Sequence, residues 1–319
     1  MNEDCLKLTT YFGERQRAGE GFLADALLDV YGRNDVQASV LLRGVEGFGG
    51  KHHLRTDRLL TLSEDLPLVS IAVDARPRIE ALLDEVVSLE RHGLVTVERA
   101  RMLTGEIGPV ALSEQTKLTV YLGRQERVNG TPAFVAVCDL LQRRGIAGAT
   151  ALLGVDGTAH GVRERARFFA RNAEVPMMII AVGDGQRIAA VLPELGGLLR
   201  RPLLTLERVR VCKRDGQRLG EPGGDGLQKL MVYASGHHVE LVRRLRASGA
   251  GGVTCLRGVW GFHGDHAPHG DRLLQLRRRA PVVTVIVDEP DRIARSFAIV
   301  DELTRDSGLV TSELVPRRV

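Results

Sequence analysis

The strongest candidate for chemistry in this sequence is a glycine-rich segment with basic side chains, residues 43–57. Glycine allows positive φ angles, so the backbone there can turn several N–H groups toward an anion. Arg43, Lys51 and Arg55 can add charge-assisted hydrogen bonds to a phosphate group. The segment predicts an anion-binding loop, and the alternative is that its glycines only form a tight bend.

The same pattern returns twice, near residues 152 and 256. The second occurrence has lost much of it, because Leu153 stands in place of Arg43 and Thr158 in place of Phe48. Its site is therefore expected to be degenerate. An anion could still be held there by the arginines that follow, Arg163, Arg165 and Arg167.

Histidines form a second candidate site. His263, His266 and His269 place three imidazoles at a spacing of three residues, and His52-His53 stands in the matching part of the first occurrence. A loop can gather such ligands around a metal ion, but no occurrence supplies a complete set of ligands. A metal site at these three histidines is one hypothesis, and a solvated histidine-rich loop is the other.

Motifs of known catalytic sites are missing from the sequence. A Walker A loop ending at Lys51 would need a leading glycine at Val45 and a Ser or Thr at His52. There is no G-x-S-x-G or H-E-x-x-H pattern, and neighbouring carboxylates such as Glu64-Asp65 fit a loop or a helix cap. We therefore expect no catalytic residues and a protein that is not an enzyme.

Composition narrows the class of protein further. Of the 319 residues 44% are hydrophobic and 26% are charged, as in ordinary globular proteins, and the formal net charge is +4. Arginines and acids alternate along the whole chain, which is typical of a solvated surface of mixed sign. Aromatic residues make up only 4%, too few for a platform that stacks single-stranded nucleic acid. A nucleic-acid partner is therefore not expected.

The N-terminus and the cysteines indicate a cytoplasmic protein. Glu3 and Asp4 stand where a signal peptide carries basic residues, and no stretch approaches about 18 apolar residues, so membrane insertion is not expected. The cysteines are scattered without C-x-x-C spacing, which points away from zinc or redox motifs. We expect buried or incidental thiols at all four of them, Cys5, Cys138, Cys212 and Cys255.

Four sequence markers recur three times in one order. The first is an alternating stretch that ends in tyrosine, at residues 6–11, 116–121 and 228–233. The second is the glycine segment, and the third is a proline before an apolar run closed by aspartate, at residues 67–74, 176–184 and 281–288. The fourth is a mainly apolar stretch that leads into a glutamate, at residues 94–99, 203–208 and 309–313. This repeated order predicts three tandem copies of one domain.

Each copy is predicted to have the element order βαββαβ. In the first copy, residues 6–12 alternate as in a strand, and residues 22–31 carry apolar side chains at helical spacing. Strands follow at residues 36–45 and 68–73, then a helix from Pro77 and a last strand at residues 94–101. Gly93 stands where the second helix should end. This order is that of a ferredoxin-like unit, an α+β fold with both helices on one face of an antiparallel sheet.

The other face of such a sheet would be bare, yet Val69, Ile71 and Val73 are too apolar to face water. We expect the three sheets to pack against each other, so that one monomeric chain forms a pseudo-trimer. The predicted domains cover residues 1–104, 115–213 and 227–319. Between them, residues 104–114 and 215–226 are rich in Gly, Pro and polar side chains, as expected of linkers.

The stretch from Arg43 to Gly49, followed by His53, Thr56 and residues 63–67, resembles the bacterial PII-like family called domain of unknown function 190. All three copies resemble it, the first most closely. The resemblance implies ferredoxin-like units in a threefold assembly, with clefts between units where adenine nucleotides or other small effectors bind near the base of a long loop. It also implies a signalling protein that reports metabolite status to a transporter, channel or enzyme.

By this resemblance, the loop base that holds the effector would be Arg43, Gly44, Gly47, Phe48 and Gly49 in copy one and Arg257, Gly258, Gly261 and Phe262 in copy three. Lys51 joins them on the charge argument above. The Gly-Asp-Gly-Lys signature of true PII proteins is replaced by residues 91–94. The main hypothesis is a PII-like regulator of a partner protein that binds a small anionic effector, an adenine nucleotide by kinship. The alternatives are a metal-binding or metal-tolerance protein, as in the PII-related CutA proteins, and a structural adaptor without a small ligand.

Overall fold

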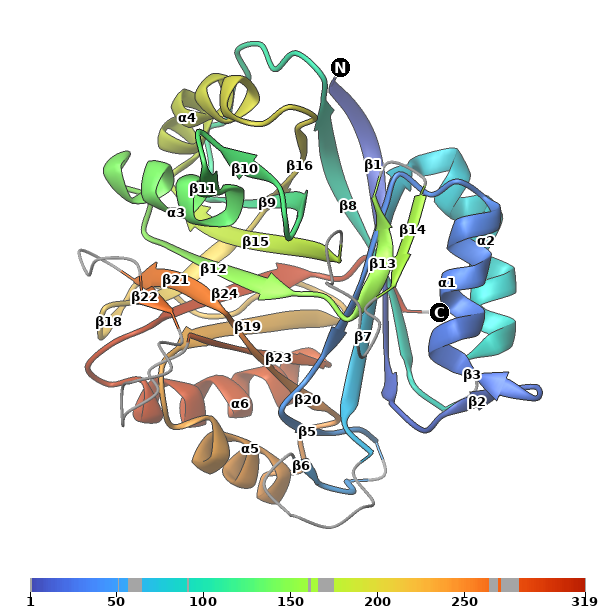
Figure 1. Cartoon of the computed structure of the whole chain (residues 1–319). Coiled ribbons are helices and arrows are strands. Elements are labelled where there is room, and N and C mark those ends of the chain that lie inside the picture. The colour runs from blue at the N-terminus through green and yellow to red at the C-terminus, as the bar shows by residue number, and fades with distance from the viewer. Residues whose placement is uncertain are drawn as a thin grey trace.

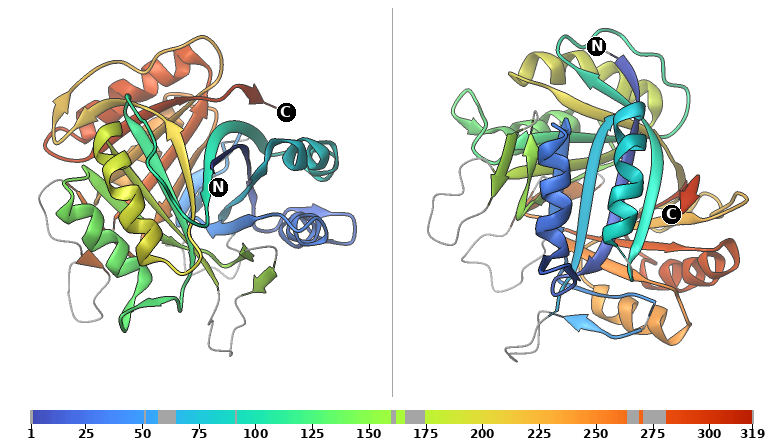
Figure 2. Two further views of the ribbon diagram at one scale, coloured as in Figure 1. Left: turned by 90° about the horizontal axis from the view of Figure 1, so that it is seen from above. Right: turned by 90° about the vertical axis from the view of Figure 1, so that its right-hand side faces the viewer.

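The computed structural model describes residues 2–50, 52–56, 65–90, 92–159, 162–165, 175–263, 269–270 and 281–318. These residues form three lobes, each with a sheet and two helices on the outer side of it (Figure 1). Figure 2 shows from two further directions that the helices lie outside and the sheets face inward. The predicted mixed α/β architecture with antiparallel sheets is confirmed.

The first repeat runs through six main elements. They are β1 (Asn2–Gly13), α1 (Leu23–Arg33), β4 (Ala38–Arg43), β7 (Pro67–Ala75), α2 (Arg76–Leu89) and β8 (Leu94–Thr104). A short hairpin of β2 (Arg17–Ala18) and β3 (Gly21–Phe22) precedes α1. The helix α2 begins one residue before Pro77, where proline is well tolerated because the first N–H groups of a helix have no partner within it.

The other two repeats follow the same order of elements. The second consists of β9 (Thr116–Gly123), α3 (Ala133–Arg143), β12 (Gly148–Leu153), β15 (Pro176–Gly183), α4 (Gly185–Leu198) and β16 (Leu203–Arg208). The third consists of β19 (Gln228–Ala234), α5 (His238–Ala247), β20 (Val253–Arg257), β23 (Val282–Asp288), α6 (Pro290–Leu303) and β24 (Leu309–Leu314). A hairpin of β10 (Arg127–Val128) and β11 (Thr131–Pro132) precedes α3.

The first strand of each repeat lies in the interior of its sheet, between the third and the fourth. The strand orders are β4-β7-β1-β8, β12-β15-β9-β16 and β20-β23-β19-β24, and all these pairs are antiparallel. Lys7 therefore stands directly opposite Glu98. The same register places Lys117 opposite Glu207 and Lys229 opposite Glu313.

The outer edges of the three sheets are completed by strands from neighbouring repeats. The glycine segment of each repeat forms a short strand that pairs with the second strand of the repeat before it in the cycle. These strands are β13 (Asp156–Ala159) on β4, β21 (Trp260–His263) on β12 and β5 (Glu46–Phe48) on β20. They carry the partners β14 (Val162–Arg165), β22 (His269–Gly270) and β6 (Arg55–Thr56).

A second set of pairings joins the last strands of successive repeats. The end of β8 pairs with β16, while β17 (Arg210–Arg214) pairs with β24 and β25 (Arg317–Arg318) pairs with β8. Each last strand is thus extended onto the next repeat in a closed cycle. The short strand β18 (Gln217–Arg218) pairs with β17 and lies inside the linker predicted at residues 215–226. Strands that close one another's edges leave few unpaired N–H and C=O groups for other chains.

Buried apolar side chains form one shared core and one core within each repeat. The shared core brings together inner-face residues of all three sheets, including Val69, Met178 and Val285. The other three cores lie between each sheet and its helices, for example around Leu27, Val137 and Leu241. Both faces of every sheet are therefore buried, which accounts for the apolar alternation of the sequence on both sides of the pleat.

Candidate functional site

The glycine segments lie at the junctions between repeats, and their N–H groups are used there. Gly44 N–H donates to Pro67 O at 2.8 Å, and Gly258 N–H donates to Pro281 O at 2.7 Å. The N–H of the following valine reaches the neighbouring repeat, from Val45 to Cys255 O at 2.9 Å, from Val155 to Leu41 O at 2.8 Å and from Val259 to Ala151 O at 2.8 Å. The valine N–H groups therefore join neighbouring repeats, whereas those of Gly44 and Gly258 donate within their own repeat.

Close backbone approach explains why several of these positions are glycine. A Cβ atom on Gly47 would lie well under 3.0 Å from the carbonyl oxygen of Val253, and one on Gly261 would meet that of Ala149 in the same way. Gly157 would meet Ser39 O. By contrast, nothing lies within 4 Å of a Cβ atom on Gly49. Glycine is thus required by the strand pairing at the first three positions.

The two phenylalanines of the predicted loop base are core residues of a neighbouring repeat. Phe48 packs into the core of the third repeat, and Phe262 packs with 0% exposure into that of the second. Thr158 takes this place at the junction of repeats 1 and 2, where its hydroxyl donates to Val36 O at 3.3 Å and lies 3.0 Å from Ser39 Oγ. These aromatic rings hold the repeats together, so they are not free to stack on a ligand.

The two arginines of the first glycine segment are paired with acids. Arg43 forms a bidentate pair with Glu14, with Nε–Oε1 at 3.0 Å and Nη2–Oε2 at 2.8 Å. Arg55 pairs with Asp65 at 2.9 Å. Arg257 is half-buried at the end of β20. Lys51 and Arg167 lie outside the described residues, as do the side chains of Arg163 and Arg165, whose backbone forms β14.

The structure describes only some of the histidines in the predicted metal site. His263 is half-buried at the end of β21, and the backbone of His269 pairs with Gly261. His266 and the side chain of His269 lie outside the described residues. In the first repeat, the ring of His52 stacks on Phe48 with the ring centroids 5.5 Å apart. A metal site at the three histidines stays a prediction.

A cleft lies at the junction between repeats 1 and 2. It has a volume of about 370 Å³ and is lined by Glu14, Arg15, Phe22, Ala24, Asp25, Leu41, Leu68, Val155 and Asp156. Apolar side chains of both repeats line it, together with the charged residues Glu14, Arg15, Asp25 and Asp156. Arg43, one of the predicted site residues, reaches the rim of the cleft through its pair with Glu14.

Side-chain size explains why the next junction differs. Ala24 is the second residue of α1, and Asp156 follows Gly154 by two residues; the matching positions at the junction of repeats 2 and 3 are Phe134 and Trp260. Both aromatic side chains are larger than their counterparts at the first junction, and they pack against the core of the second repeat. At the third junction, residues 235–237 alone separate β19 from α5, so the segment 14–22 that supplies Glu14 and Phe22 in repeat 1 has no counterpart.

The segment between α2 and β8 departs from the sequence prediction. The helix ends at Leu89 with Glu90 as its C-cap, so the C-cap predicted at Gly93 is wrong. Gly93 instead packs against the carbonyl oxygen of Tyr11, where a side chain has no room. The Glu90 carboxylate accepts hydrogen bonds from His92 N–H at 2.7 Å and Gln16 Nε2 at 2.6 Å. A carboxylate at this place is unfavourable for phosphate binding.

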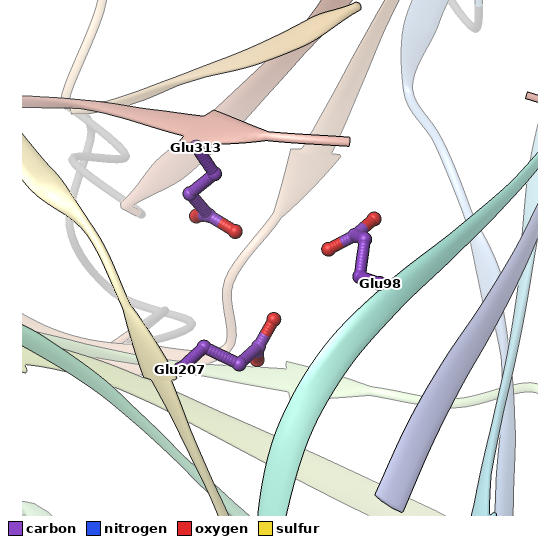
Figure 3. A group of neighbouring side chains, drawn as sticks. All are labelled: Glu98, Glu207 and Glu313. Atoms are coloured by element: carbon purple, nitrogen blue, oxygen red, sulfur yellow. The ribbon is translucent and has the colours of Figure 1, made fainter. Parts of the chain in front are cut away.

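A closed ring of six buried charges lies where the three repeats meet. Its glutamates come from β8, β16 and β24 and point toward one another (Figure 3). Each lysine pairs with the glutamate of its own repeat, Lys7 with Glu98 at 2.9 Å, Lys117 with Glu207 at 3.1 Å and Lys229 with Glu313 at 3.0 Å. Each also pairs with a glutamate of another repeat, Lys7 with Glu207, Lys117 with Glu313 and Lys229 with Glu98.

The lysines of this ring hold Glu98 and Glu313 in the charged form. Burial outweighs the carboxylates at Lys117 and lowers its pKa to about 8. Burial alone would raise the pKa of Glu98, but the ammonium groups of Lys229 and Lys7 outweigh it and hold that pKa below its ordinary value. Lys117 and Lys229 lower the pKa of Glu313 in the same way against the effect of burial. The three carboxylates offer oxygens within 4.8 Å of one another, a spacing that would suit a metal ion. Three ammonium groups stand between them, so the ring is neutral without a metal.

Comparison with known proteins places the chain in a family. The model of DUF190, described as an uncharacterized ACR, matches residues 5–102, 115–211 and 232–317. The chain belongs to the DUF190 family. The predicted resemblance and the three tandem copies are therefore confirmed. Among solved structures, the crystal structure of aspartate kinase from Synechocystis aligns with 98% of this DUF190 chain and 44% of its own, at 11% identity and a TM-score of 0.26, a likeness too weak to carry an argument.

Two further features limit the chemistry of this DUF190 chain. All four cysteines are buried, as expected, and burial raises the pKa of Cys5, Cys212 and Cys255 to about 12. Thiols with such a pKa are poor nucleophiles at neutral pH. None of the described helices is long and apolar enough to cross a membrane.

The ring is the feature that sequence reasoning missed, although a signal for it was present. Lys7, Lys117 and Lys229 each stand at the same place in the first marker, inside an otherwise apolar strand. The three glutamates of the ring likewise stand at one and the same place in the fourth marker. A charge kept in the middle of a buried strand in all copies indicates a partner of opposite sign.

Proposed function

We propose that this DUF190 chain is a PII-like signalling protein of the cytoplasm that binds a small effector between repeats 1 and 2 and regulates a partner protein. The cleft of about 370 Å³ carries this proposal, because that volume lies in the range of sites for small ligands. A ligand in this cleft contacts two repeats and can therefore alter their relative placement. The role proposed for it is that of an effector rather than of a substrate.

The proposal includes a finer description of the fold. The order β4-β7-β1-β8 and the two helices on one side of the sheet agree with a ferredoxin-like unit. Three such units exchange edge strands in a cycle. This arrangement supports a PII-like pseudo-trimer within a single chain, where a one-domain relative would need three copies.

The lining of the cleft favours an adenine nucleotide held by its base and ribose. Leu41, Leu68 and Val155 offer apolar contact for a planar base. The carboxylates of Glu14 and Asp25 can accept hydrogen bonds from ribose hydroxyls or an exocyclic amine. Phosphate groups would then extend to the rim, toward Arg15 and Arg43. In this proposal Arg43 keeps its predicted role in anion binding. The glycine segment that lines the site, however, is that of repeat 2 and not that of repeat 1.

A ligand in this cleft would act on the partner through β13. Val155 and Asp156 line the cleft, and β13 continues from Asp156 into its pairing with β14. A ligand that binds one arrangement of this hairpin better than another shifts the population toward it. The proposed partner, a transporter, channel or enzyme, would bind the hairpin in one of these arrangements.

The test is a thermal-shift titration of the full chain with ATP, ADP, AMP and divalent metal ions. A nucleotide at 100 times its Kd should stabilise the protein by about 2.7 kcal/mol. Ala24→Phe copies Phe134, the aromatic residue at the matching position of repeat 2, and should abolish the nucleotide shift without lowering the Tm of the free protein. Arg43→Leu copies Leu153 and should weaken nucleotides with more phosphates most. Arg257→Leu, the matched control in repeat 3, should leave the shift unchanged.

Other outcomes would overturn the proposal. Nucleotide shifts that survive Ala24→Phe would place the ligand elsewhere. A response to metal ions alone would favour the histidine hypothesis, and replacing His263, His266 and His269 should then remove it. No response to any compound would favour a structural adaptor.

A further inference from the structure

A small cavity lies beside the ring of charges and is lined by residues of all three repeats. Its volume is about 40 Å³. Lys7, Thr9 and Tyr11 line it from alternate positions of β1, and Lys117, Thr119 and Tyr121 do so from β9. Lys229 and Met231 complete this wall from β19. Side chains two residues apart share one face of a strand, so these residues form a continuous wall from the lysines to the tyrosines. The rest of the lining is apolar, from Val69, Ile71, Met178, Ile180, Leu256 and Val285.

The polar groups of this wall, three ammonium groups and several hydroxyls, can all donate hydrogen bonds. An ammonium group has three N–H donors, and each of the three lysines pairs with two carboxylates of the ring. The hydroxyl of Tyr121 is buried and lies close to that of Thr205. Burial raises the pKa of Tyr121 above its ordinary value, so this hydroxyl keeps its proton. The glutamates of the ring do not line the cavity.

We propose that this axial cavity binds one small monovalent anion of halide size. A cavity needs about 10–15 Å³ to hold one water molecule, so the volume here suffices for a chloride or bromide ion and excludes nucleotides and phosphate esters. The six charges of the ring sum to zero, and an added anion would lie nearer to the three ammonium groups than to the carboxylates. Charge-assisted N–H and O–H donors compensate its loss of hydration.

The proposed site is independent of the effector cleft. It lies on the axis, between the sheets, and it exists only when all three repeats are closed around it. An anion that binds the folded chain and not the unfolded chain raises the unfolding temperature in proportion to the logarithm of its concentration. Halide should therefore stabilise the protein even in the Ala24→Phe variant, whether or not any nucleotide binds.

The decisive experiment is crystallographic and uses the unaltered protein. Crystals grown in sodium bromide should show one strong anomalous peak in the axial cavity, in contact with lysine ammonium groups and Tyr121. In parallel, the Tm should rise when bromide or chloride replaces gluconate at constant ionic strength, because gluconate is too large for the cavity. Two outcomes would overturn the proposal. One is a cavity that holds water and gives no anomalous signal, and the other is a Tm that is equal in all three salts.

A matched pair of variants tests the role of the hydroxyl. Tyr121→Phe removes one donor from the cavity and should weaken the apparent halide affinity about tenfold, the order expected for a hydrogen bond to a charged group. Tyr31→Phe removes the hydroxyl of another fully buried tyrosine, which belongs to the core of the first repeat, and should leave the halide response unchanged. Equal halide affinity in both variants would contradict the assignment of Tyr121.

Discussion

At the scale of single residues, the ring shows how buried charges can determine an assembly without adding much net stability. Each lysine lies between two carboxylates, one from its own repeat and one from another. Desolvation of six charges opposes folding, and mutual attraction offsets it only when the ring is complete. Any misplaced repeat would leave a buried lysine or glutamate without its partner, so the ring disfavours wrong arrangements.

Removing a single member of the ring should therefore be severe. Lys117→Met leaves Glu207 and Glu313 each with one ammonium group instead of two, and we expect a loss of about 3–5 kcal/mol in the free energy of unfolding. Urea unfolding followed by circular dichroism measures it. The control is Glu194→Ala, which breaks the exposed pair with Arg144 and should cost less than about 1 kcal/mol. Similar losses in the two variants would show that a buried lysine of the ring contributes no more to the free energy of unfolding than an exposed ion pair does.

The ring should also make stability sensitive to acid. The pKa of Glu98 and that of Glu313 are lowered in the folded protein, so below the ordinary pKa of a carboxyl the unfolded chain binds more protons than the folded chain. Their contribution is present above about pH 4.5 and is lost as the pH falls toward the folded values. Urea midpoints measured from pH 7 to pH 3 should decline steeply below pH 5. A flat profile over this range would mean that the glutamates are not held in their charged form.

At the scale of elements, the glycine segments act as strands that connect the repeats. The segment around Gly47 was expected to be a loop, because no local pattern distinguishes a three-residue strand whose partner lies 200 residues away. The strands and helices within each repeat were predictable because their periodicity is local. The cleft was not predictable, because it is lined by residues of two repeats, among them Leu41 and Val155, which meet only through the closed cycle of repeats.

Substitutions at two neighbouring glycines should separate strand pairing from loop flexibility. Gly47→Ala places a Cβ atom against Val253 O and should disrupt the pairing of β5 with β20, with a loss of about 2 kcal/mol. Gly49→Ala meets nothing within 4 Å and should be nearly neutral. Both losses are measured by chemical denaturation. Equal effects would indicate that these glycines serve an irregular loop rather than the junction between repeats 1 and 3.

At the scale of the whole molecule, closure distinguishes this chain from an open array of repeats. In an open array each repeat contacts only its neighbours along the chain, so terminal repeats can unfold separately. Here β25, at the end of the chain, pairs with β8 of the first repeat, and the shared core includes residues of all three repeats. Loss of any one repeat would expose that core and break the ring.

The chain should therefore unfold in one cooperative transition, and its one tryptophan makes this measurable. Trp260 lies at the junction of repeats 2 and 3, so its fluorescence follows that junction, whereas far-ultraviolet circular dichroism follows the helices of all repeats. If the cycle and the ring couple the repeats, both signals should change at the same urea concentration with the same slope. A fluorescence transition that precedes the loss of helix would show that the junction opens first, and the three repeats would then be separate folding units that merely lie in contact.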